Sequence, residues 1–315
     1  MNGAPLEIAI IGAGAMGSLF GARLSRAAEV TLIDPWTAHI QALAENGLTL
    51  EGVDGKTETV KLAAVSDPGQ VDGPVDLAVI FTKSHATARA AGTARALLKP
   101  DGLALTLQNG LGNLPVIAEI VGSDRAVAGV TAHGATVIGP GHIRHAGSGK
   151  TAVGRPSTRA ELVDRMVESF RAAGIETEVA DDVEGLIWGK LIVNVGINAL
   201  AAIIRVENGV LGETPECEAL MMQAVDEAAA VARAIGVRLP DGDPRKRVRA
   251  VCRSTAANRA SMLQDILRGR PTEVAVINGA IVEEAKAVGI KVPVNLMLTR
   301  IIQALEATAD RRVAP

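Results

Sequence analysis

Three polar side chains recur at every fourth position of an otherwise apolar stretch. Lys190, Asn194 and Asn198 lie in WGKLIVNVGINAL, and this spacing places them along one face of a helix. A buried ammonium or carboxamide is unfavourable without a partner, so the stripe either ties helices together or binds a polar ligand. Because the three form one stripe on a helix that must face the ligand cleft, we favour a substrate site over a structural stripe.

A second polar cluster lies further along the chain, in NRASMLQD and GRPTE. It contains Asn258 and Ser261, and then Glu273, which follows a Pro-Thr pair that could begin a helix. From the residues alone, Glu273 is interpreted as a charge that complements the helix dipole, and Ser261 as an ordinary helix residue. Neither residue by itself predicts chemistry.

A glycine-rich turn near the N-terminus indicates a nucleotide site. The sequence GAGAMG follows the apolar run Ile8–Ile11 and precedes a helical pattern, and the next apolar run ends on Asp34. This context is the dinucleotide-binding fingerprint, and an ordinary strand-to-helix turn would not need all of its features. The first glycine permits the tight turn, the second lets the backbone approach the pyrophosphate, and the third lets helix and strand pack closely. The residues expected to line the cofactor there are Gly12, Ala13, Gly14, Ala15, Met16 and Gly17.

The acid at the end of the second strand bears on the choice of nucleotide. The chain reads Ile33-Asp34-Pro35-Trp36 at that place, without Arg or Lys. A carboxylate suits the free 2′-hydroxyl of NAD and repels the 2′-phosphate of NADP. The predicted cofactor is therefore NAD(H).

Apolar strands and helical segments alternate through the first half of the chain. The strand 76–81 leads to Lys83, and the strand 103–107 opens onto Asn109. This alternation predicts a parallel sheet of the Rossmann type with helices on both faces. Ligands bind beyond the carboxyl ends of such strands, so Lys83 and Asn109 are both expected beside the cofactor. Helices are expected at 36–45 and 86–98, with a hairpin at 48–65 around Asp54-Gly55.

Short strands replace this pattern from residue 126 onward. Segments 127–131, 135–138, 143–145 and 151–153 predict an antiparallel extension of the sheet, followed by a helix at 161–172 and a strand at 175–179. Strand signals then vanish, and helices are expected at 182–202, 217–235, 244–262, 272–288 and 294–307. The predicted fold class is α/β, with a dinucleotide-binding domain at 1–180 and an all-helical substrate domain at 181–315.

Composition limits the partners. The 315-residue chain has a formal net charge of −3, no Tyr and three Phe, so nucleic acid is not an expected partner. Cys217 and Cys252 lack nearby ligand residues, so neither a metal site nor a disulfide is expected. Met1–Pro5 is too short for a signal peptide and no apolar run approaches membrane length, so we expect a cytoplasmic protein without a membrane partner.

The five histidines are weighed as catalysts because dehydrogenases often use one. They show no metal-ligand spacing, and solvated loop histidines are commoner than catalytic ones. Lysine is therefore the better proton donor, while His145 stays open as a base. His85, His133, His142 and His145 are expected in loops or short strands, and His39 on a surface helix.

Five segments, taken in order, resemble the ketopantoate reductase (2-dehydropantoate 2-reductase) family over essentially the whole chain. They are GAGAMG, Lys83 after DLAVIF, Gln108-Asn109-Gly110, WGKLIVNVGINAL and SMLQDILRGRPTEVAVINGAIV. The last two are far more diagnostic than the glycine turn. The resemblance implies reduction of the 2-oxo group of ketopantoate to the alcohol of pantoate, a step toward coenzyme A.

The resemblance also implies roles for single residues. Lys190 corresponds to the proton donor, and Glu273 to an active-site glutamate. Asn109 corresponds to the residue between nicotinamide and substrate, and Lys83 to the family's cleft lysine. Substrate-binding residues are implied at Asn194, Asn198 and Asn258, with Ser261 for the substrate carboxylate. Many members of the family carry a basic residue where this chain has Asp34, so the family implies NADP(H) while the acid favours NAD(H).

Two other functions stay open. A GxGxMG turn with a Lys-x-x-x-Asn helix also occurs in 3-hydroxy acid dehydrogenases, so another 2-oxo acid or a 3-hydroxy acid is an alternative substrate. The SMLQD and GRPTE segments favour ketopantoate reductase over these enzymes. A non-catalytic nucleotide sensor is the other alternative, and an intact Lys190 and Glu273 argue against it. The apolar helices of the second domain could support a homodimer or simply form its core.

Overall fold

The computed structural model describes residues 4–156, 158–240 and 242–311. Within them the chain forms two compact units, one of residues 4–108 and 113–183, and the other of residues 109–112 and 184–311. The division expected from the sequence lies at residue 180. The segment Asn109–Gly112, which the sequence places after a strand of the first domain, groups with the second unit.

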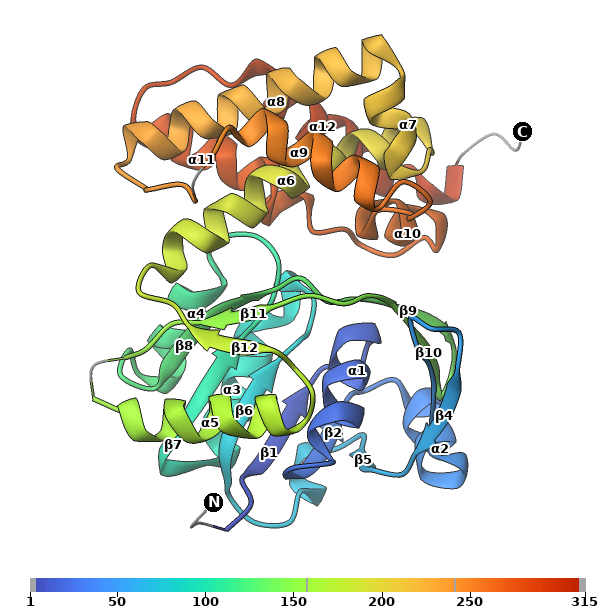
Figure 1. Ribbon diagram of the computed structural model, residues 1–315, viewed down its shortest axis with the longest axis vertical. Helices are drawn as coiled ribbons and strands as arrows, with labels where there is room; N and C mark the ends of the chain where they lie inside the picture. Colours follow the sequence, from blue (N-terminus) through green and yellow to red (C-terminus); the bar gives the residue numbers. More distant parts are fainter. Residues whose placement is uncertain (1–3, 157, 241, 312–315) are drawn as a thin grey trace. The chain divides into compact units, whose positions relative to one another are not determined.

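The first unit is built on a mostly parallel sheet, eight-stranded in the described residues, as the fold-class prediction requires (Figure 1). Two strands at one end of the sheet run in the opposite direction to the rest, because β11 is antiparallel to β8 and β12 is parallel to β11. In sheet order the strands are β12 (Thr177–Val179), β11 (Thr151–Val153), β8 (Ala126–Thr131), β7 (Leu98–Thr106), β6 (Val75–Ile80), β1 (Glu7–Ile11), β2 (Glu29–Ile33) and β5 (Ala63–Val65).

Helices cover both faces of this sheet because its strands are apolar on both sides. Ile8 and Ile10 of β1 share an apolar cluster with α1 (Ala15–Leu24) and α5 (Ala160–Ala172), which lie in front of the sheet in Figure 1. Ala9, on the opposite side of the same strand, packs with α3 (Thr87–Leu97) and α4 (Asn113–Val121). The second cluster is rich in alanine, which lets its helices approach closely. No helix was expected at Asn113–Val121, where α4 forms.

A separate sheet, four-stranded in the part that the structure describes, corrects the expected antiparallel extension. The hairpin around Asp54-Gly55 forms as expected, but its first strand also pairs with the strand at 142–147. In this position Ile143 of that strand is completely buried, whereas β11 pairs with β8 in the larger sheet. The order is β4 (Thr57–Val60), β3 (Leu48–Glu51), β10 (His142–Gly147) and β9 (Gly134–Gly139). Also in this unit are α2 (Thr37–Asn46) and the short 3₁₀ turns Pro68–Gln70 and Ser84–Ala86.

The described residues of the second unit are helical, in agreement with the predicted all-helical domain. Its core helix is α6, in which Gly196 lets α8 approach, since a Cβ there would lie 2.9 Å from a methyl of Val225. The helices are α6 (Val183–Ile204), α7 (Asn208–Glu213), α8 (Pro215–Ala234), α9 (Pro244–Ser254), α10 (Ser261–Leu267), α11 (Asn278–Ala287) and α12 (Pro293–Ala307), with 3₁₀ turns at Val274–Val276 and Ala309–Arg311.

The expectation that no apolar run approaches membrane length is wrong for α6. This helix is long and apolar enough to span a membrane by length and composition, but 72% of its most apolar window is buried inside the protein. The apolar composition of α6 is explained by its position in the core, where the other helices of its unit pack around it.

Two helices expected to be continuous are interrupted. The helix expected at 244–262 ends at Ser254, because the following loop bonds to α7: Gly209 N–H donates to the Ala256 carbonyl at 3.0 Å, and Asn208 Nδ2 donates to Thr255 Oγ1 at 2.9 Å. The helix expected at 272–288 starts only at Asn278, since Ile277 has φ −107° and ψ −93°, outside the helical region. Helices α7 and α10 were not expected as separate elements.

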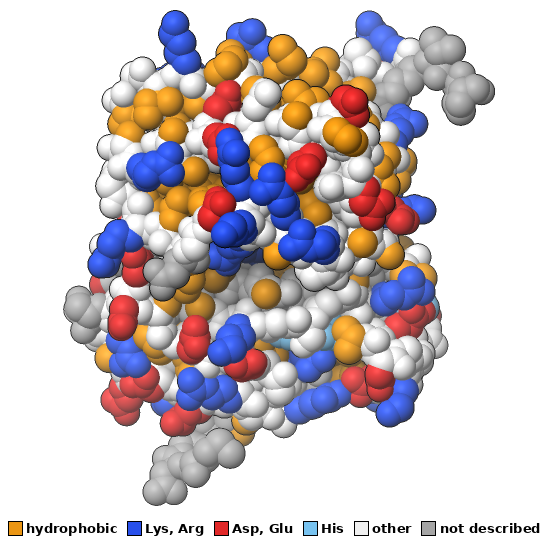
Figure 2. Space-filling model, turned by 45° about the horizontal axis from the view of Figure 1, so that its top comes forward, with side chains coloured by type: hydrophobic (Ala, Val, Ile, Leu, Met, Phe, Trp, Pro, Cys, Tyr) orange, Lys and Arg blue, Asp and Glu red, His pale blue; other side chains and the backbone are white. Residues whose placement is uncertain are grey.

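Charged side chains of both signs are interspersed over the face shown in Figure 2. Helix α9 is rich in Arg, and two of its arginines are paired with acids of α8. Arg245 contacts Asp226, and Arg249 contacts Glu218. Exposed pairs of this kind contribute little to the stability of the fold.

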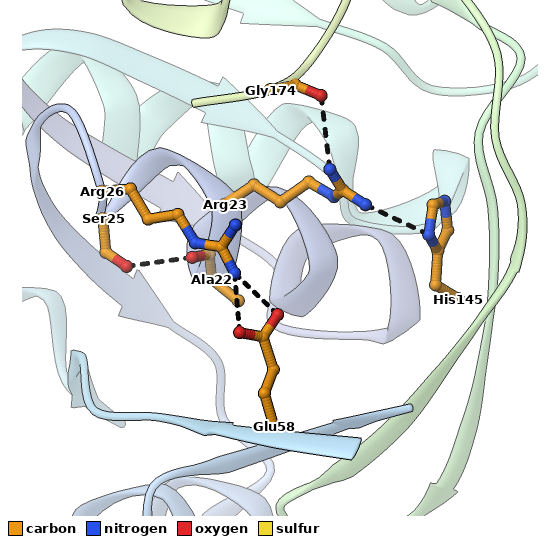
Figure 3. A network of polar contacts seen from close by, with 7 residues as sticks. All are labelled: Ala22, Arg23, Ser25, Arg26, Glu58, His145 and Gly174. Atoms are coloured by element: carbon orange, nitrogen blue, oxygen red, sulfur yellow. Dashed lines mark hydrogen bonds and ion pairs between the residues drawn. The ribbon is translucent and has the colours of Figure 1, made fainter. Parts of the chain in front are cut away.

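Two histidines expected in loops or short strands lie in such segments, but they are buried rather than solvated: His133 is 8% exposed and His145 is 2% exposed. His145 of β10 accepts from Arg23 at its Nδ1 (3.3 Å), and the same guanidinium donates to the Gly174 carbonyl at 3.3 Å (Figure 3). His145 Nε2 then donates to His133 Nδ1 at 3.0 Å, which leaves the His133 Nε2–H buried without a partner among the described residues. Burial and the neighbouring His145 lower the pKa of His133 to about 4, and burial also lowers the pKa of His145.

This histidine pair predicts acid-sensitive stability. A base whose pKa is lower in the folded state stabilises the fold above its unfolded pKa, and that stability is lost as the pH falls. With a shift from 6.5 to about 4 at His133, the free energy of unfolding should fall by about 2 kcal/mol for this group between pH 7.5 and pH 5. Urea unfolding at both pH values measures the fall.

The matched variant is His133→Asn, whose Oδ1 can replace Nδ1 as acceptor but does not titrate in this range. It should remove most of that fall, whereas His85→Gln, at an exposed histidine, should not. An undiminished fall in His133→Asn would contradict the assignment.

Candidate active site

Helix α6 carries the polar stripe expected from the spacing. Lys190 and Asn194 are half-buried, and Asn198 is buried at 6% exposure. Asn198 Nδ2 lies 3.5 Å from Ser261 Oγ at the start of α10, so the structure brings these two predicted residues together. The early end of α9 is what frees Ser261 to begin a new helix at this place.

Lys190 has the electrostatics of an acid that works near neutral pH. Burial lowers its pKa from 10.5 to about 8, and the negative charge of Glu273 opposes part of that shift. Glu273 itself is buried, at 6% exposure. The dipole-complementing role expected for Glu273 in a helical first turn is wrong, because this residue precedes a 3₁₀ turn and the helix starts five residues later. Its charge acts on Lys190 instead.

The chain around Glu273 is held in place by hydrogen bonds from several elements. Thr272 N–H donates to Glu306 of α12 at 2.6 Å. Asn278 is fully buried, and its Nδ2 donates to the carbonyl of Val195 on α6 (3.1 Å) and to Asn295 Oδ1 (3.0 Å). These bonds fasten the irregular segment to the same helix that bears Lys190.

Asn109 belongs to the same unit. The next two residues of its loop lie against the 3₁₀ turn after Glu273: Leu111 N–H donates to the Val276 carbonyl at 2.9 Å, and a Cβ on Gly110 would lie 2.4 Å from that oxygen. Gly110 also has φ +85°, which favours glycine. Asn258 lies in the exposed loop before α10, and its carbonyl accepts from Asn208 N–H at 3.0 Å.

The glycine turn of the first unit has the geometry that its sequence predicts. Gly12 has φ +101°, and a Cβ there would lie 2.6 Å from Thr82 N. A Cβ on Gly17 would lie 1.8 Å from the Gly12 carbonyl oxygen, so α1 can approach β1 only without a side chain. A Cβ on Gly14 would meet nothing within 4 Å. The open space at Gly14 and the N-terminus of α1 together fit an incoming phosphate.

Asp34 is tied to this turn through the backbone. Its Oδ2 accepts from Ala13 N–H at 2.7 Å, and its Oδ1 accepts from Trp36 N–H at 2.9 Å. Each carboxylate oxygen can accept further hydrogen bonds, so ribose hydroxyls remain compatible with this arrangement. Ala15 and Met16 open α1 behind the turn.

The segment after β6 is organised by a side chain that follows β7. Gln108 Nε2 donates to the Thr82 carbonyl (2.8 Å) and to Thr87 Oγ1 (2.9 Å), which flank Lys83 in sequence. Lys83 is half-buried and precedes the 3₁₀ turn Ser84–Ala86. The sequence shows Gln108 only as part of a loop motif, without a signal for this role.

Two residues of the first unit, Ser18 and His39, were not predicted to contribute to the site. His39 is fully buried, not on a surface helix as expected, because its ring stacks on Trp36 and bonds to Ser18. The available signal was the period of α2, in which His39 falls beside Ile40 and Leu43 on the buried side. A separate pocket is lined by Gly189, Ile192, Val193, Leu239, Pro240, Gly242, Asp243, Pro244 and Arg247. The face of α6 that lines it is turned away from the stripe of Lys190.

A dinucleotide-type turn on a mostly parallel sheet, and a lysine of lowered pKa on a helical unit, are features expected of a nicotinamide-dependent oxidoreductase. Comparison with known proteins names its family. The model described as "Ketopantoate reductase PanE/ApbA" matches residues 8–158, and that of its C-terminal part matches residues 182–306. The chain belongs to the ketopantoate reductase family and is an NAD(P)-dependent enzyme.

Full-length relatives support this membership. A 2-dehydropantoate 2-reductase of Halobacterium salinarum is 39% identical over 302 residues, covering 95% of this chain and 98% of the relative. One of Pyrococcus abyssi is 38% identical, covering 98% and 100%. Among solved structures, a PanE/ApbA family ketopantoate reductase from Ralstonia eutropha has a TM-score of 0.88 at 36% identity, covering 97% of this chain and 100% of that one. D-mandelate dehydrogenase with NADH and anilino(oxo)acetate has 0.89 at 31%, with the same coverage.

The two glycines of the turn give a matched pair of variants. Gly17→Ala should lower the free energy of unfolding by more than about 3 kcal/mol, because the new methyl would overlap a backbone oxygen. Gly14→Ala should change stability by less than about 0.5 kcal/mol, since φ −66° suits alanine. It should still weaken NADH and NADPH binding, because the methyl occupies the space where the phosphates approach.

Urea unfolding and fluorescence titration with each nucleotide measure the two effects. Unchanged nucleotide affinity in Gly14→Ala would contradict this placement of the pyrophosphate.

Proposed function

We propose that the enzyme reduces the 2-oxo group of ketopantoate to pantoate with NADH, in the pathway toward coenzyme A, with Lys190 as proton donor. The observation that carries the proposal is the half-buried Lys190, whose pKa is lowered to about 8 beside the buried Glu273. The family identification supports it, since relatives that match over their whole length are 2-dehydropantoate 2-reductases.

The residues present fit a nicotinamide dinucleotide, given the open space at Gly14 and the carboxylate at Asp34. When bound, the nicotinamide supplies a hydride, with both bonding electrons, to the carbonyl carbon of the substrate. The carbonyl π electrons move onto oxygen, where the Lys190 ammonium stabilises the negative charge and then donates its Nζ proton. The negative charge of Glu273 opposes the effect of burial on the Lys190 pKa, and so favours the protonated lysine.

The other polar residues of the second unit bind the substrate in this proposal. The carboxamides of Asn194 and Asn198 suit a substrate hydroxyl, and the Ser261 hydroxyl suits its carboxylate. The contact between Asn198 and Ser261 supports a shared role, because it places an amide and a hydroxyl side by side. Asn258 and Asn109 would complete the set, the first from the loop before α10 and the second from the loop bonded to Val276.

NADH is proposed over NADPH on the strength of Asp34. Its carboxylate is held by two backbone N–H groups, and the following residues Pro35 and Trp36 supply no positive charge for a 2′-phosphate. The NADH complexes of D-mandelate dehydrogenase, 31% and 30% identical to this chain, support the same choice. Lys83 would lie along the bound cofactor.

A second candidate is the reduction of another 2-oxo acid, such as the aromatic oxo acid that corresponds to mandelate. It is favoured by one observation, the likeness to D-mandelate dehydrogenase at a TM-score of 0.89.

The proposal also includes the location and the assembly of the enzyme. The free thiols of Cys217 and Cys252 fit a cytoplasmic enzyme. The exposed Met297 and Ile301 of α12 offer apolar surface to a second copy in a homodimer.

Steady-state kinetics test the proposal directly. Ketopantoate, phenylglyoxylate and pyruvate are each supplied with NADH and with NADPH, and kcat/KM is compared. We expect ketopantoate with NADH to give the highest value, at least about tenfold above the other pairs, which corresponds to about 1.4 kcal/mol. A clear preference for NADPH would contradict the role of Asp34, and a preference for phenylglyoxylate would favour the second candidate.

Lys190 predicts a pH profile. A protonated lysine is required for reduction, and its pKa is about 8, so kcat/KM should be constant below that pH and fall as the pH rises through it. Lys190→Ala should lose roughly 10²–10⁴-fold in kcat and lose this inflection. The control is Lys246→Ala, at an exposed lysine of α9. A flat wild-type profile through pH 8, or full activity in Lys190→Ala, would exclude Lys190 as the donor.

A further inference from the structure

A chain of hydrogen bonds runs from the second sheet to the glycine turn. Gly141 N–H, between β9 and β10, donates to His39 Nδ1 at 2.9 Å. His39 Nε2 lies 3.1 Å from Ser18 Oγ, and this hydroxyl donates to the Ala13 carbonyl at 2.8 Å. Ala13 N–H in turn donates to Asp34. His39 and Ser18 are both completely buried.

The direction of this chain follows from its first bond. A backbone N–H can only donate, so His39 Nδ1 is the acceptor and the ring proton of the neutral imidazole lies on Nε2. Nε2–H must then donate to Ser18 Oγ, whose own proton is directed at Ala13. Burial lowers the pKa of His39, in keeping with a neutral ring, while the charge of Asp34 opposes that shift. Trp36 stacks on the imidazole, with ring centroids 4.7 Å apart and planes 9° from parallel, and so holds its orientation.

The end of the chain bears on the phosphate site. In a trans peptide the carbonyl of one residue and the N–H of the next point in opposite directions. Because Ser18 holds the Ala13 carbonyl toward α1, the N–H of Gly14 is turned away from the helix, on the residue where a side chain would meet open space. A backbone N–H with this orientation at a helix N-terminus is a donor for a phosphate oxygen.

We propose that His39 is a positioning residue for the cofactor: through Ser18 it orients the Ala13–Gly14 peptide so that the Gly14 N–H faces the pyrophosphate. This inference rests on the proposed dinucleotide site. It assigns to α2 and to the β9–β10 turn, which do not belong to the glycine fingerprint, a part in nucleotide affinity.

Two isosteric variants separate the two bonds of His39. His39→Asn can keep an acceptor for Gly141 at the Nδ1 position but loses the donor to Ser18. His39→Gln can keep the donor at the Nε2 position but loses the acceptor. If the proposal holds, His39→Asn and Ser18→Ala each raise the Kd for NADH about tenfold, whereas His39→Gln stays within about threefold of wild type. The matched control is Gln41→Ala, at an exposed residue of the same helix.

Kd is measured by fluorescence titration of the full-length protein with NADH and NADPH, with urea unfolding of every variant. The KM for NADH should rise with Kd in His39→Asn, with a smaller change in kcat. Wild-type affinity in His39→Asn and Ser18→Ala would overturn the proposal. So would a loss of affinity in all three variants that follows their loss of stability, because that pattern indicates a structural role alone. If wild type binds neither nucleotide, the dinucleotide site itself is wrong, and this inference fails with it.

Discussion

A buried carboxylate and a half-buried ammonium on neighbouring segments are the constraint on which the second unit depends. Either charge alone would be strongly unfavourable in the interior, so Lys190 on α6 requires a negative partner, and Glu273 supplies it. To bring that carboxylate to α6, the chain must leave helical geometry before Asn278. The buried amide of Asn278, bonded to the Val195 carbonyl, secures the same segment at its other end.

This constraint explains where the sequence misleads. Helical periodicity correctly predicts an all-helical unit, and it fails in the stretches at 255–260 and 272–277. The first stretch precedes Ser261 and the second contains Glu273. Local helix propensity is therefore overridden by tertiary contacts at the residues that build the candidate site. The hydrogen bonds responsible come from α7, α12 and α6, which are distant in sequence. A prediction based on neighbouring residues in the sequence cannot include these long-range hydrogen bonds.

The first unit was more predictable, because its rules are local. The glycine turn depends on the φ of Gly12 and on the contact between Gly17 and the Gly12 carbonyl, both set within a few residues. The pairing of β10 with β3 was not predictable in the same way, since several short strands could occupy the same edge and their partners lie far away in the sequence. One of the hydrogen bonds of the buried His39 depends on the same sheet, because His39 Nδ1 accepts from Gly141 N–H between β9 and β10.

The two units handle charge differently, and the difference suits their proposed tasks. Glu273 acts on Lys190 through an opposite charge, which favours a protonated lysine and so a proton available for transfer. Asp34 is held by two backbone N–H groups, which stabilise a carboxylate without cancelling its net charge. An arginine partner would orient Asp34 equally well, but it would also neutralise the site and offer a ligand to a 2′-phosphate. Fixing the carboxylate with amides therefore preserves a negative charge, which in the proposed function favours NADH over NADPH.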